Sequence, residues 1–312
     1  MFSISFQCKR SISISKPMAD VRSVVGDFSL WGHWSPWLCM EKDCQFSTEG
    51  EPRQPSHRQD WDGQRIGSGN MVMTSQTETS FVYDLTFLKP WKSKSTVEFS
   101  FNEQEGETEV TWIMNGSLPF FMFFMKKMMI AWVESDFDRG LLMLKDYIEQ
   151  GQVLSDTEVT GTRQKQGFFY LGIDKESSIA DMPEIMAKDF SQLMEWVEAS
   201  DIAAPKEVIS FYHKYDLVNG RCKFTSALLY DEEPENTKDL ASGQVPDHQV
   251  VQVVHTGPYK YLGNAWSTVM AEQRTKKLKM DKQLSWYELY INDPSETPEA
   301  DLKTEINIPI KN

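Results

Sequence analysis

Hydrophobic and polar residues alternate along much of the first half of the chain. Apolar side chains fill most even positions from Ile4 to Ile14, and a period of two recurs over residues 81–87, 97–101 and 110–114. This period predicts strands with one buried face. The half ends in a helical pattern whose apolar seam consists of Ile130, Val133, Phe137, Leu141, Leu144 and Ile148. We therefore expect antiparallel strands followed by a long helix that packs against them.

The second half repeats one order of elements: strand, helix, strand, strand. The pattern predicts these elements first at residues 168–173, 183–197, 208–215 and 222–230, and then at 250–255, from 258 onward, 285–291 and 302–310. A single offset of 75 residues aligns Pro183 with Pro258, and residues 210–215 with 285–290. We interpret residues 167–230 and 249–310, approximately, as an internal duplication.

Residues 151–166 contain few large apolar side chains, and their Gly, Ser, Thr and charged residues predict a linker. The 312 residues are about twice the usual size of one domain, which also favours two cores. We place the domains at residues 1–150 and 167–312. The expected fold class is α+β in both.

The charge pattern argues against direct contact with nucleic acid. The net charge of −14 divides into about −5 for residues 1–150 (15 basic and 20 acidic) and about −9 for residues 151–312 (17 basic and 26 acidic). Nucleic-acid binding depends on Lys and Arg that neutralise phosphates, and neither half is basic. The acidity favours solubility and, mildly, cationic ligands.

Cysteine and histidine spacing indicates neither a structural metal nor a bound cofactor. The four cysteines form no CxxC pair, and the five histidines form no HExxH motif. We expect a reduced, cytoplasmic setting without metal or cofactor. The first residues alternate as a strand does and lack the apolar centre of a signal peptide, so we expect no export.

An almost wholly apolar run, LPFFMFFM, occupies residues 118–125 and continues after Lys126 and Lys127 to Val133. Spanning a bilayer takes roughly 20 apolar residues. The two lysines interrupt the run too early for that, so we predict the start of a buried helix that does not cross a membrane.

The first half resembles the polyketide cyclase/START-like (SRPBCC) superfamily of helix-grip folds. The resemblance rests on DFSLWGHWSPW at residues 27–37, WDGQRIGSGNM at residues 61–71 and the closing helix. It implies a curved antiparallel sheet, a long C-terminal helix and a hydrophobic cavity between them. The candidate wall residues are aromatic: Trp34, Trp61, Tyr83 and Trp112. For each of them a position in the packed core is the more typical interpretation, because large aromatic residues on alternating strands usually belong to the core.

The second half resembles the GyrI-like (AraC-type) effector-binding family. The residues that carry the resemblance are HTGPYKYLGNAW at 255–266 and WYELYINDPSETPEADLKTEINIPI at 286–310. It implies two related strand-helix-strand-strand units and a cleft for small, often cationic and lipophilic molecules. Some members hydrolyse electrophilic ligands. We interpret Tyr259 and His255, in the HTGPY turn, as structural.

Glu288 is the strongest candidate site residue. Residues two apart on a strand share a face, so Trp286, Glu288 and Tyr290 point together. A carboxylate among aromatic rings suits a cation, and burial would raise its pKa. The offset of 75 makes Phe211, His213 and Tyr215 the counterparts, so we expect these three to approach the same cleft. His213 could hydrogen-bond Glu288 or a polar group of the ligand, or it could be only a partly buried histidine.

Three functions fit these residues. The first is a sensor or carrier that binds a small hydrophobic or cationic molecule around Glu288. The second is a hydrolase of electrophilic small molecules, with Glu288 as general base and a tyrosine as proton donor. The third is an effector module of a transcription regulator that acts through a separate partner. The oligomeric state stays open.

Overall fold

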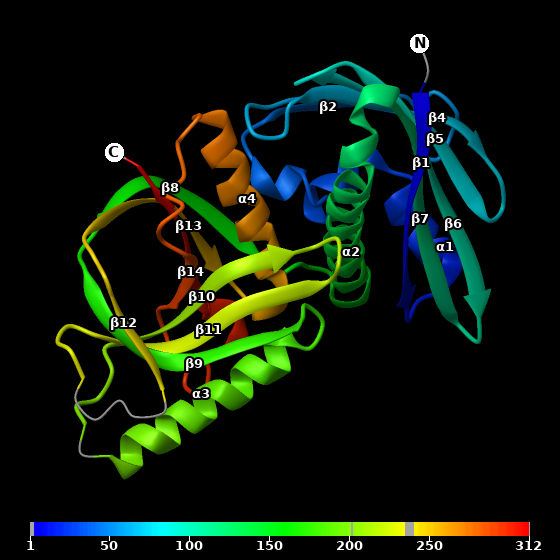
Figure 1. Ribbon diagram of the computed structural model, residues 1–312. Helices are drawn as coiled ribbons and strands as arrows, with labels where there is room; N and C mark the ends of the chain where they lie inside the picture. Colours follow the sequence, from blue (N-terminus) through cyan, green and yellow to red (C-terminus); the bar gives the residue numbers. More distant parts are fainter. Residues whose placement is uncertain (1–2, 201, 235–239, 312) are drawn as a thin grey trace. The chain divides into compact units, whose positions relative to one another are not determined.

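The computed structural model describes residues 3–200, 202–234 and 240–311 (Figure 1). These residues form two compact units that divide between Val153 and Leu154. Both units combine an antiparallel sheet with helices, which confirms the predicted α+β fold class. None of the helices among these residues is long and apolar enough to cross a bilayer.

The first unit is a seven-stranded antiparallel sheet with a long closing helix. Its strand order is β1-β7-β6-β5-β4-β3-β2. The strands are β1 (Ser3–Ile14), β2 (Gln45–Glu49), β3 (Arg58–Asp62), β4 (Ser68–Gln76), β5 (Ser80–Lys89), β6 (Ser93–Gln104) and β7 (Glu107–Pro119). The helices are α1 (Met18–Val25), η1 (Phe28–His33), η2 (Leu38–Met40), η3 (Phe120–Met125) and α2 (Lys126–Gln150).

Helix α2 packs closely on the sheet because small and aromatic residues alternate at the contact. Phe137 stacks on Trp112 of β7 with ring centroids 4.2 Å apart. One turn later, a Cβ at Gly140 would come within 2.9 Å of both Trp112 and Pro36, so only glycine permits this approach. The predicted seam therefore contacts the sheet closely at Phe137, and Gly140 beside it permits this approach.

The second unit is an eight-stranded antiparallel sheet with the order β12-β9-β11-β10-β14-β15-β13-β8. Its strands are β8 (Asp156–Lys165), β9 (Phe168–Ser178), β10 (Glu207–Asp216), β11 (Arg221–Tyr230), β12 (Ala241–Val245), β13 (His248–Thr256), β14 (Trp286–Tyr290) and β15 (Lys303–Ile310). Its helices are α3 (Met182–Ala199), η4 (Tyr259–Tyr261), α4 (Leu262–Thr275) and η5 (Glu299–Asp301).

The strand order is that of a duplicated domain. The triplet β9-β11-β10 is mirrored by β14-β15-β13, so the two repeats meet where β10 pairs with β14. Helix α3 packs on β9 and β11, and helix α4 packs on β13 and β15. The pair β10–β14 therefore lies at the centre of the sheet, between the two helices.

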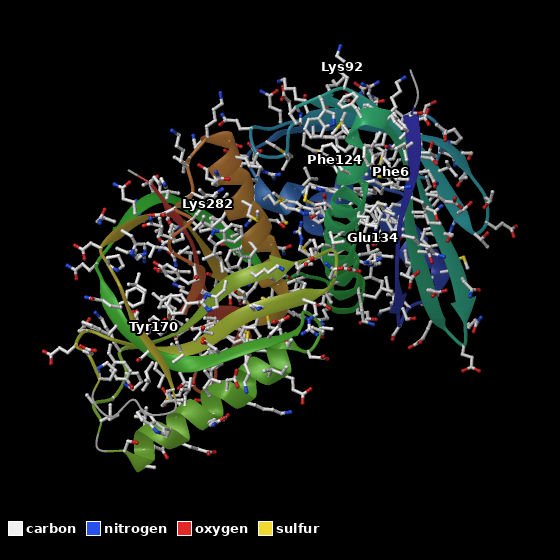
Figure 2. All side chains as sticks on the ribbon, viewed as in Figure 1. Phe6, Lys92, Phe124, Glu134, Tyr170 and Lys282 are labelled. Atoms are coloured by element: carbon white, nitrogen blue, oxygen red, sulfur yellow. The ribbon has the colours of Figure 1, made fainter. Side chains whose placement is uncertain are left out.

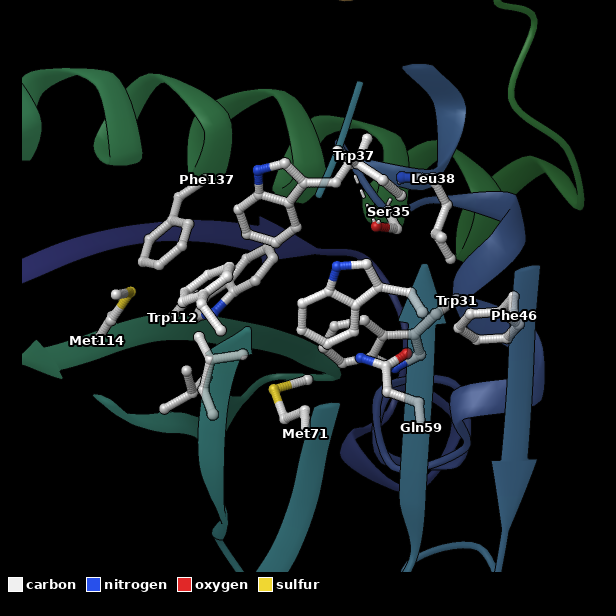
Figure 3. A pocket seen from close by; sticks show the side chains of 15 residues that line it. Trp31, Ser35, Trp37, Leu38, Phe46, Gln59, Met71, Trp112, Met114 and Phe137 are labelled. Atoms are coloured by element: carbon white, nitrogen blue, oxygen red, sulfur yellow. Dashed lines mark hydrogen bonds between the residues drawn. The ribbon is translucent and has the colours of Figure 1, made fainter. Parts of the chain in front are cut away.

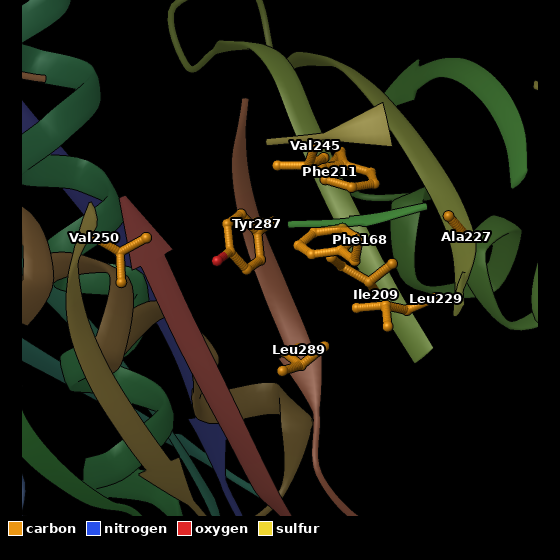
Figure 4. Packing of buried hydrophobic residues seen from close by; sticks show 9 residues of the cluster. All are labelled: Phe168, Ile209, Phe211, Ala227, Leu229, Val245, Val250, Tyr287 and Leu289. Atoms are coloured by element: carbon orange, nitrogen blue, oxygen red, sulfur yellow. The ribbon is translucent and has the colours of Figure 1, made fainter. Parts of the chain in front are cut away.

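The opposite face of this sheet carries its own apolar core (Figure 4). Tyr287 and Leu289 of β14 pack there with Ile209 and Phe211 of β10. Because successive residues of a strand point to opposite faces, Trp286, Glu288 and Tyr290 point toward the helices. Both faces of the central strands are thus covered.

The predicted linker at residues 151–166 is wrong over most of its length. Residues 156–165 form β8, which pairs with β13 from Asp156↔Thr256 to Lys165↔His248. The segment lacks large apolar side chains because it is an edge strand, and an edge strand needs fewer of them. Only residues 151–155 and Gln166 lie outside regular elements.

Candidate functional site

The Glu288 carboxylate is buried and held by three neutral donors. Its Oε1 atom accepts a hydrogen bond from Trp266 Nε1 of α4 at 2.5 Å. Its Oε2 atom accepts from the hydroxyls of Tyr212 and Tyr290, each at 2.8 Å. Only 2% of the Glu288 side chain surface is exposed.

Burial raises the pKa of Glu288, because the charged form loses its hydration. The hydrogen bonds from Trp266, Tyr290 and Tyr212 act in the opposite direction but do not cancel this effect. Among the described residues, no lysine, arginine or histidine forms an ion pair with Glu288. The site is therefore a buried acidic group without a positive partner of its own.

Aromatic rings surround this carboxylate. Trp266 packs edge-on against Tyr212 at 5.3 Å and lies 6.1 Å from Trp286. Tyr290 contacts Phe190 of α3 at 5.8 Å and Tyr259 of η4 at 5.5 Å, measured between ring centroids. Both helices thus contribute to one aromatic enclosure, which we call the Glu288 site: Phe190, Tyr212, Tyr215, Tyr259, Trp266, Trp286, Glu288 and Tyr290.

Two tyrosines of the Glu288 site reach the surface. The side chains of Tyr215 and Tyr259 are 48% and 37% exposed. Partial burial raises the pKa of Tyr215 to about 12, and the charges of Cys222 and Glu288 add to the rise. The pKa of Tyr259 is raised for similar reasons, with Glu288 again among the causes. These two residues are the most exposed members of the Glu288 site.

The first unit contains an apolar cavity of about 150 Å³ (Figure 3). A volume of this size accommodates roughly one six-membered ring. Its walls come from the sheet, from η1 and η2, and from α2, and they include Trp31, Trp37, Trp112, Phe137 and Met71. Gln59 and Ser35 supply the polar groups of the lining.

Comparison with known families covers both units. Residues 5–149 match the family described as polyketide cyclase / dehydrase and lipid transport, and residues 163–311 match the GyrI-like small molecule binding domain. The chain therefore consists of two fused domains, one from each family. No curated protein matches the chain.

Several solved structures are similar to parts of the chain. The EcmrR–DNA complex in EcmrR-RPo is 15% identical, with 61% of this chain and 69% of that chain covered and a TM-score of 0.44. SAV2435 bound to tetraphenylphosphonium is 12% identical, with coverage of 48% and 92% and a TM-score of 0.39. CalU16 from Micromonospora echinospora is 12% identical, with coverage of 48% and 88% and a TM-score of 0.33.

In the GyrI-like domain, four of the six predicted binding residues lie together. Trp286, Glu288 and Tyr290 share the face toward the helices, and Tyr215 lies close enough for the Glu288 charge to raise its pKa. Phe211 and His213 do not join them. Phe211 packs in the core of the opposite face with Tyr287, and His213 lies on the Phe211 side at a centroid distance of 6.5 Å.

The offset of 75 does not predict which face of the sheet the β10 side chains occupy, because it is an odd number. Ser210 pairs directly with Glu288, so even-numbered residues of both strands point the same way up to Tyr212. An odd shift exchanges the two faces of a strand. A bulge between Tyr212 and Lys214 then adds a residue to β10, which returns Tyr215 to the helix face. Tyr212, and not His213, is therefore the β10 residue that reaches Glu288.

His213 belongs to a separate polar network. Thr225 donates to Asp174 Oδ1 at 2.5 Å, so its oxygen accepts from His213 Nε2 at 2.6 Å. This leaves Nδ1 to accept from the Ser285 hydroxyl at 2.8 Å. Burial lowers the pKa of His213. The expected contact between His213 and Glu288 is absent, because the two side chains occupy opposite faces of the sheet.

Sequence reasoning missed Tyr212, Trp266 and the role of Tyr259. Trp266 ends the HTGPYKYLGNAW motif, and its position on α4 is what brings an indole N–H to Glu288. Tyr259, which we expected to be only structural, packs on Tyr290. His255 is fully buried, with Nε2 placed 3.3 Å from the carbonyl of Pro258 in the same turn.

Of the four aromatic candidates in the polyketide cyclase domain, two line the cavity. Trp61 and Trp112 are part of its wall. Trp34 and Tyr83 are fully buried in the neighbouring core, where Trp34 packs on Trp31 and Tyr83 donates to the carbonyl of Val25. The wall residues Trp31, Trp37 and Phe137 were not predicted, because sequence spacing alone does not show which rings leave a gap.

Proposed function

We propose that the GyrI-like domain binds a lipophilic monovalent cation, with Glu288 as its counter-charge. The observation that carries this proposal is the pairing of a buried carboxylate with neutral donors only: Trp266, Tyr212 and Tyr290. A buried charge is costly unless an opposite charge compensates it. A ligand cation would supply that charge.

The surrounding side chains favour a lipophilic cation over a metal ion. Aromatic faces attract organic cations and bury apolar ligand surface at the same time. The Glu288 site offers rings from both repeats and only one carboxylate. A hard metal ion would require several oxygen ligands. An organic cation with apolar substituents therefore fits this chemistry best.

Entry of the ligand requires a side chain to move, because Glu288 is 2% exposed. Tyr215 and Tyr259 are the most exposed members of the site, whereas Phe190, Trp266, Trp286 and Tyr290 are half-buried. We propose that the ring of Tyr215, of Tyr259 or of both rotates away when the ligand enters. Tyr215 stands next to the β-bulge, where the regular pairing of the strand is interrupted.

A titration with a matched pair of ligands tests the proposal. Tetraphenylphosphonium serves as the rigid lipophilic cation, and triphenylphosphine oxide serves as a neutral compound of related shape. We expect saturable binding of the cation by calorimetry and binding of the oxide at least about 100-fold weaker, the range of effect seen when one partner of a buried charge pair is lost. Equal affinities for the two compounds would contradict the proposal.

We favour binding without turnover, because neutral donors already occupy most acceptor positions of the Glu288 carboxylate. Oε2 of Glu288 already accepts two hydrogen bonds and Oε1 accepts one. A carboxylate has about four acceptor positions, so only one is left for a water that a general base would activate. Hydrolysis of an electrophilic ligand, abolished in the Glu288→Gln variant, would favour the hydrolase instead.

A role as the effector module of a transcription regulator is compatible with cation binding. Residues 5–149 and 163–311 are occupied by the two domains described above. Such a role would therefore depend on a DNA-binding element that lies outside both domains.

A further inference from the structure

An exposed aromatic and basic surface lies at one end of the polyketide cyclase domain. Phe120, Phe121, Phe123 and Phe124 of η3 are 61%, 68%, 61% and 70% exposed. This reverses the expectation that residues 118–125 begin a buried helix. The end of β5 and the turn to β6 add two more exposed apolar residues, Leu88 at 45% and Trp91 at 67%.

The strand register brings these two segments to the same end of the sheet. Ser93 pairs with Phe87 across the β5–β6 turn, and Ser95 pairs with Gly116, three residues before the end of β7. Helix η3 follows β7 directly. The β5–β6 turn and η3 therefore follow the ends of neighbouring strands (Figure 2, where Lys92 and Phe124 are labelled). We call the surface formed by residues 88–94 and 120–128 the aromatic-basic patch.

The charge of this patch is opposite to that of the domain around it. Residues 85–97 and 110–133 contain five lysines, Lys89, Lys92, Lys94, Lys126 and Lys127, and no acidic residue. Residues 1–150 as a whole carry 15 basic and 20 acidic residues, a net charge of about −5. Among the described residues, Lys92, Lys94, Lys126 and Lys127 form no ion pair, whereas Lys89 pairs with Asp62.

The composition distinguishes a lipid surface from a protein partner. Contiguous exposed apolar surface marks either a protein contact or a membrane contact. The centres of protein interfaces are depleted in lysine and enriched in arginine, yet every basic residue of the patch is a lysine. Phenylalanine and tryptophan with adjacent lysines are typical of segments that lie in the headgroup region of a bilayer. Lysine side chains can bury their stems there and keep the ammonium group at the phosphates.

We propose that the aromatic-basic patch docks the protein on the surface of an anionic phospholipid bilayer. The four phenylalanines of η3 and Trp91 enter the interfacial region, while the four unpaired lysines contact lipid phosphates. Docking here means contact with one leaflet, because the apolar run is too short to span a bilayer. The proposal is independent of cation binding at Glu288.

Vesicle co-sedimentation of the full chain tests this surface. Vesicles of phosphatidylcholine alone are compared with vesicles of equal parts phosphatidylcholine and phosphatidylglycerol, at low and high salt. We expect binding to the anionic vesicles, at least tenfold weaker binding to phosphatidylcholine, and a loss of affinity as salt is raised. Absence of binding to the anionic vesicles, or equal binding to both, would overturn the proposal.

Two pairs of variants with matched controls separate the apolar and the charged contributions. Phe121→Ser/Phe124→Ser removes the two most exposed rings, and Lys92→Gln/Lys127→Gln removes two exposed charges. The controls, Met194→Ser/Val218→Ser and Lys279→Gln/Lys282→Gln, change exposed residues of the GyrI-like domain.

We expect the phenylalanine pair to abolish most vesicle binding. The lysine pair should reduce affinity roughly 30-fold, about fivefold per charge at a membrane surface. The controls should bind as the unchanged protein does. If the lysine pair binds normally, or if the phenylalanine pair instead converts an oligomer to a monomer without affecting vesicle binding, the patch is not a membrane surface. Because Lys92 and Lys127 lie on the surface, their variant tests the proposal even if the phenylalanine pair folds poorly.

Discussion

Replacement of Glu288 by glutamine is expected to weaken tetraphenylphosphonium binding about 100-fold or more and to raise the melting temperature of the protein. Binding falls because the ligand cation enters a buried site without an opposite charge. The amide keeps nearly the shape of the carboxylate, so the aromatic enclosure should persist. Calorimetric titration measures the first effect, and differential scanning calorimetry without ligand measures the second.

The sign of the stability effect follows from the raised pKa of Glu288. A carboxyl group with a higher pKa in the folded state favours folding only in its protonated form. Its ionisation costs stability as the pH rises from the unfolded-state pKa to the folded-state pKa, and the full cost persists above that window. Glutamine removes the cost, so we expect the melting temperature of the Glu288→Gln variant to exceed that of the unchanged protein at a pH above this window.

A surface glutamate provides the control for this experiment. Glu195 is an exposed residue of α3 in the same domain. Glu195→Gln makes the same change in net charge, and we expect it to alter neither the affinity nor the melting temperature appreciably. Equal losses of affinity in both variants would mean that only the overall charge of the domain attracts the cation.

Replacement of Trp112 by alanine is expected to destabilise the polyketide cyclase domain by about 3–5 kcal/mol. Trp112 is 1% exposed, stacks on Phe137, and also contacts the rings of Trp34 and Phe99. Its removal would enlarge the existing cavity and detach α2 from β7. In a domain of about 150 residues the unfolding transition should fall by roughly 10 °C.

The matched control is Trp91→Ala, because Trp91 is 67% exposed and contributes little to the core. We expect it to change stability by less than about 0.5 kcal/mol. A similar small effect for Trp112→Ala would show that α2 is held on the sheet by other contacts.

The sequence predicted the elements of this fold where one periodicity dominated. Alternation located β1, β5, β6, β7 and β15, and the 3.6-residue seam located α2. Residues 156–165 were misjudged because an edge strand with few apolar side chains has the composition of a linker. The prediction that the Phe120–Met125 segment is buried was wrong. A hydrophobic sequence indicates that burial is favourable, but it does not show whether other parts of the domain cover the segment.

In the Glu288 site, the sequence predicted the local strand geometry but not the long-range contacts. Local alternation correctly placed Trp286, Glu288 and Tyr290 on one face, because strand geometry alone decides this. Tyr212 and Trp266 reach Glu288 through the pairing of β10 with β14 and the packing of α4, which are long-range contacts. His213 was assigned to the wrong face because one residue of misalignment in the repeat inverts every side chain of a strand.

The pH dependence of cation affinity tests the role of Glu288 most directly. The cation binds the ionised carboxylate, and protons compete for the same group. As the pH falls through the raised pKa of Glu288, affinity of the unchanged protein should decrease, approaching tenfold per pH unit below that pKa. Binding by Glu288→Gln should be weak and should not vary with pH over this range. Parallel pH profiles for the two proteins would contradict the assignment of Glu288 as the counter-charge.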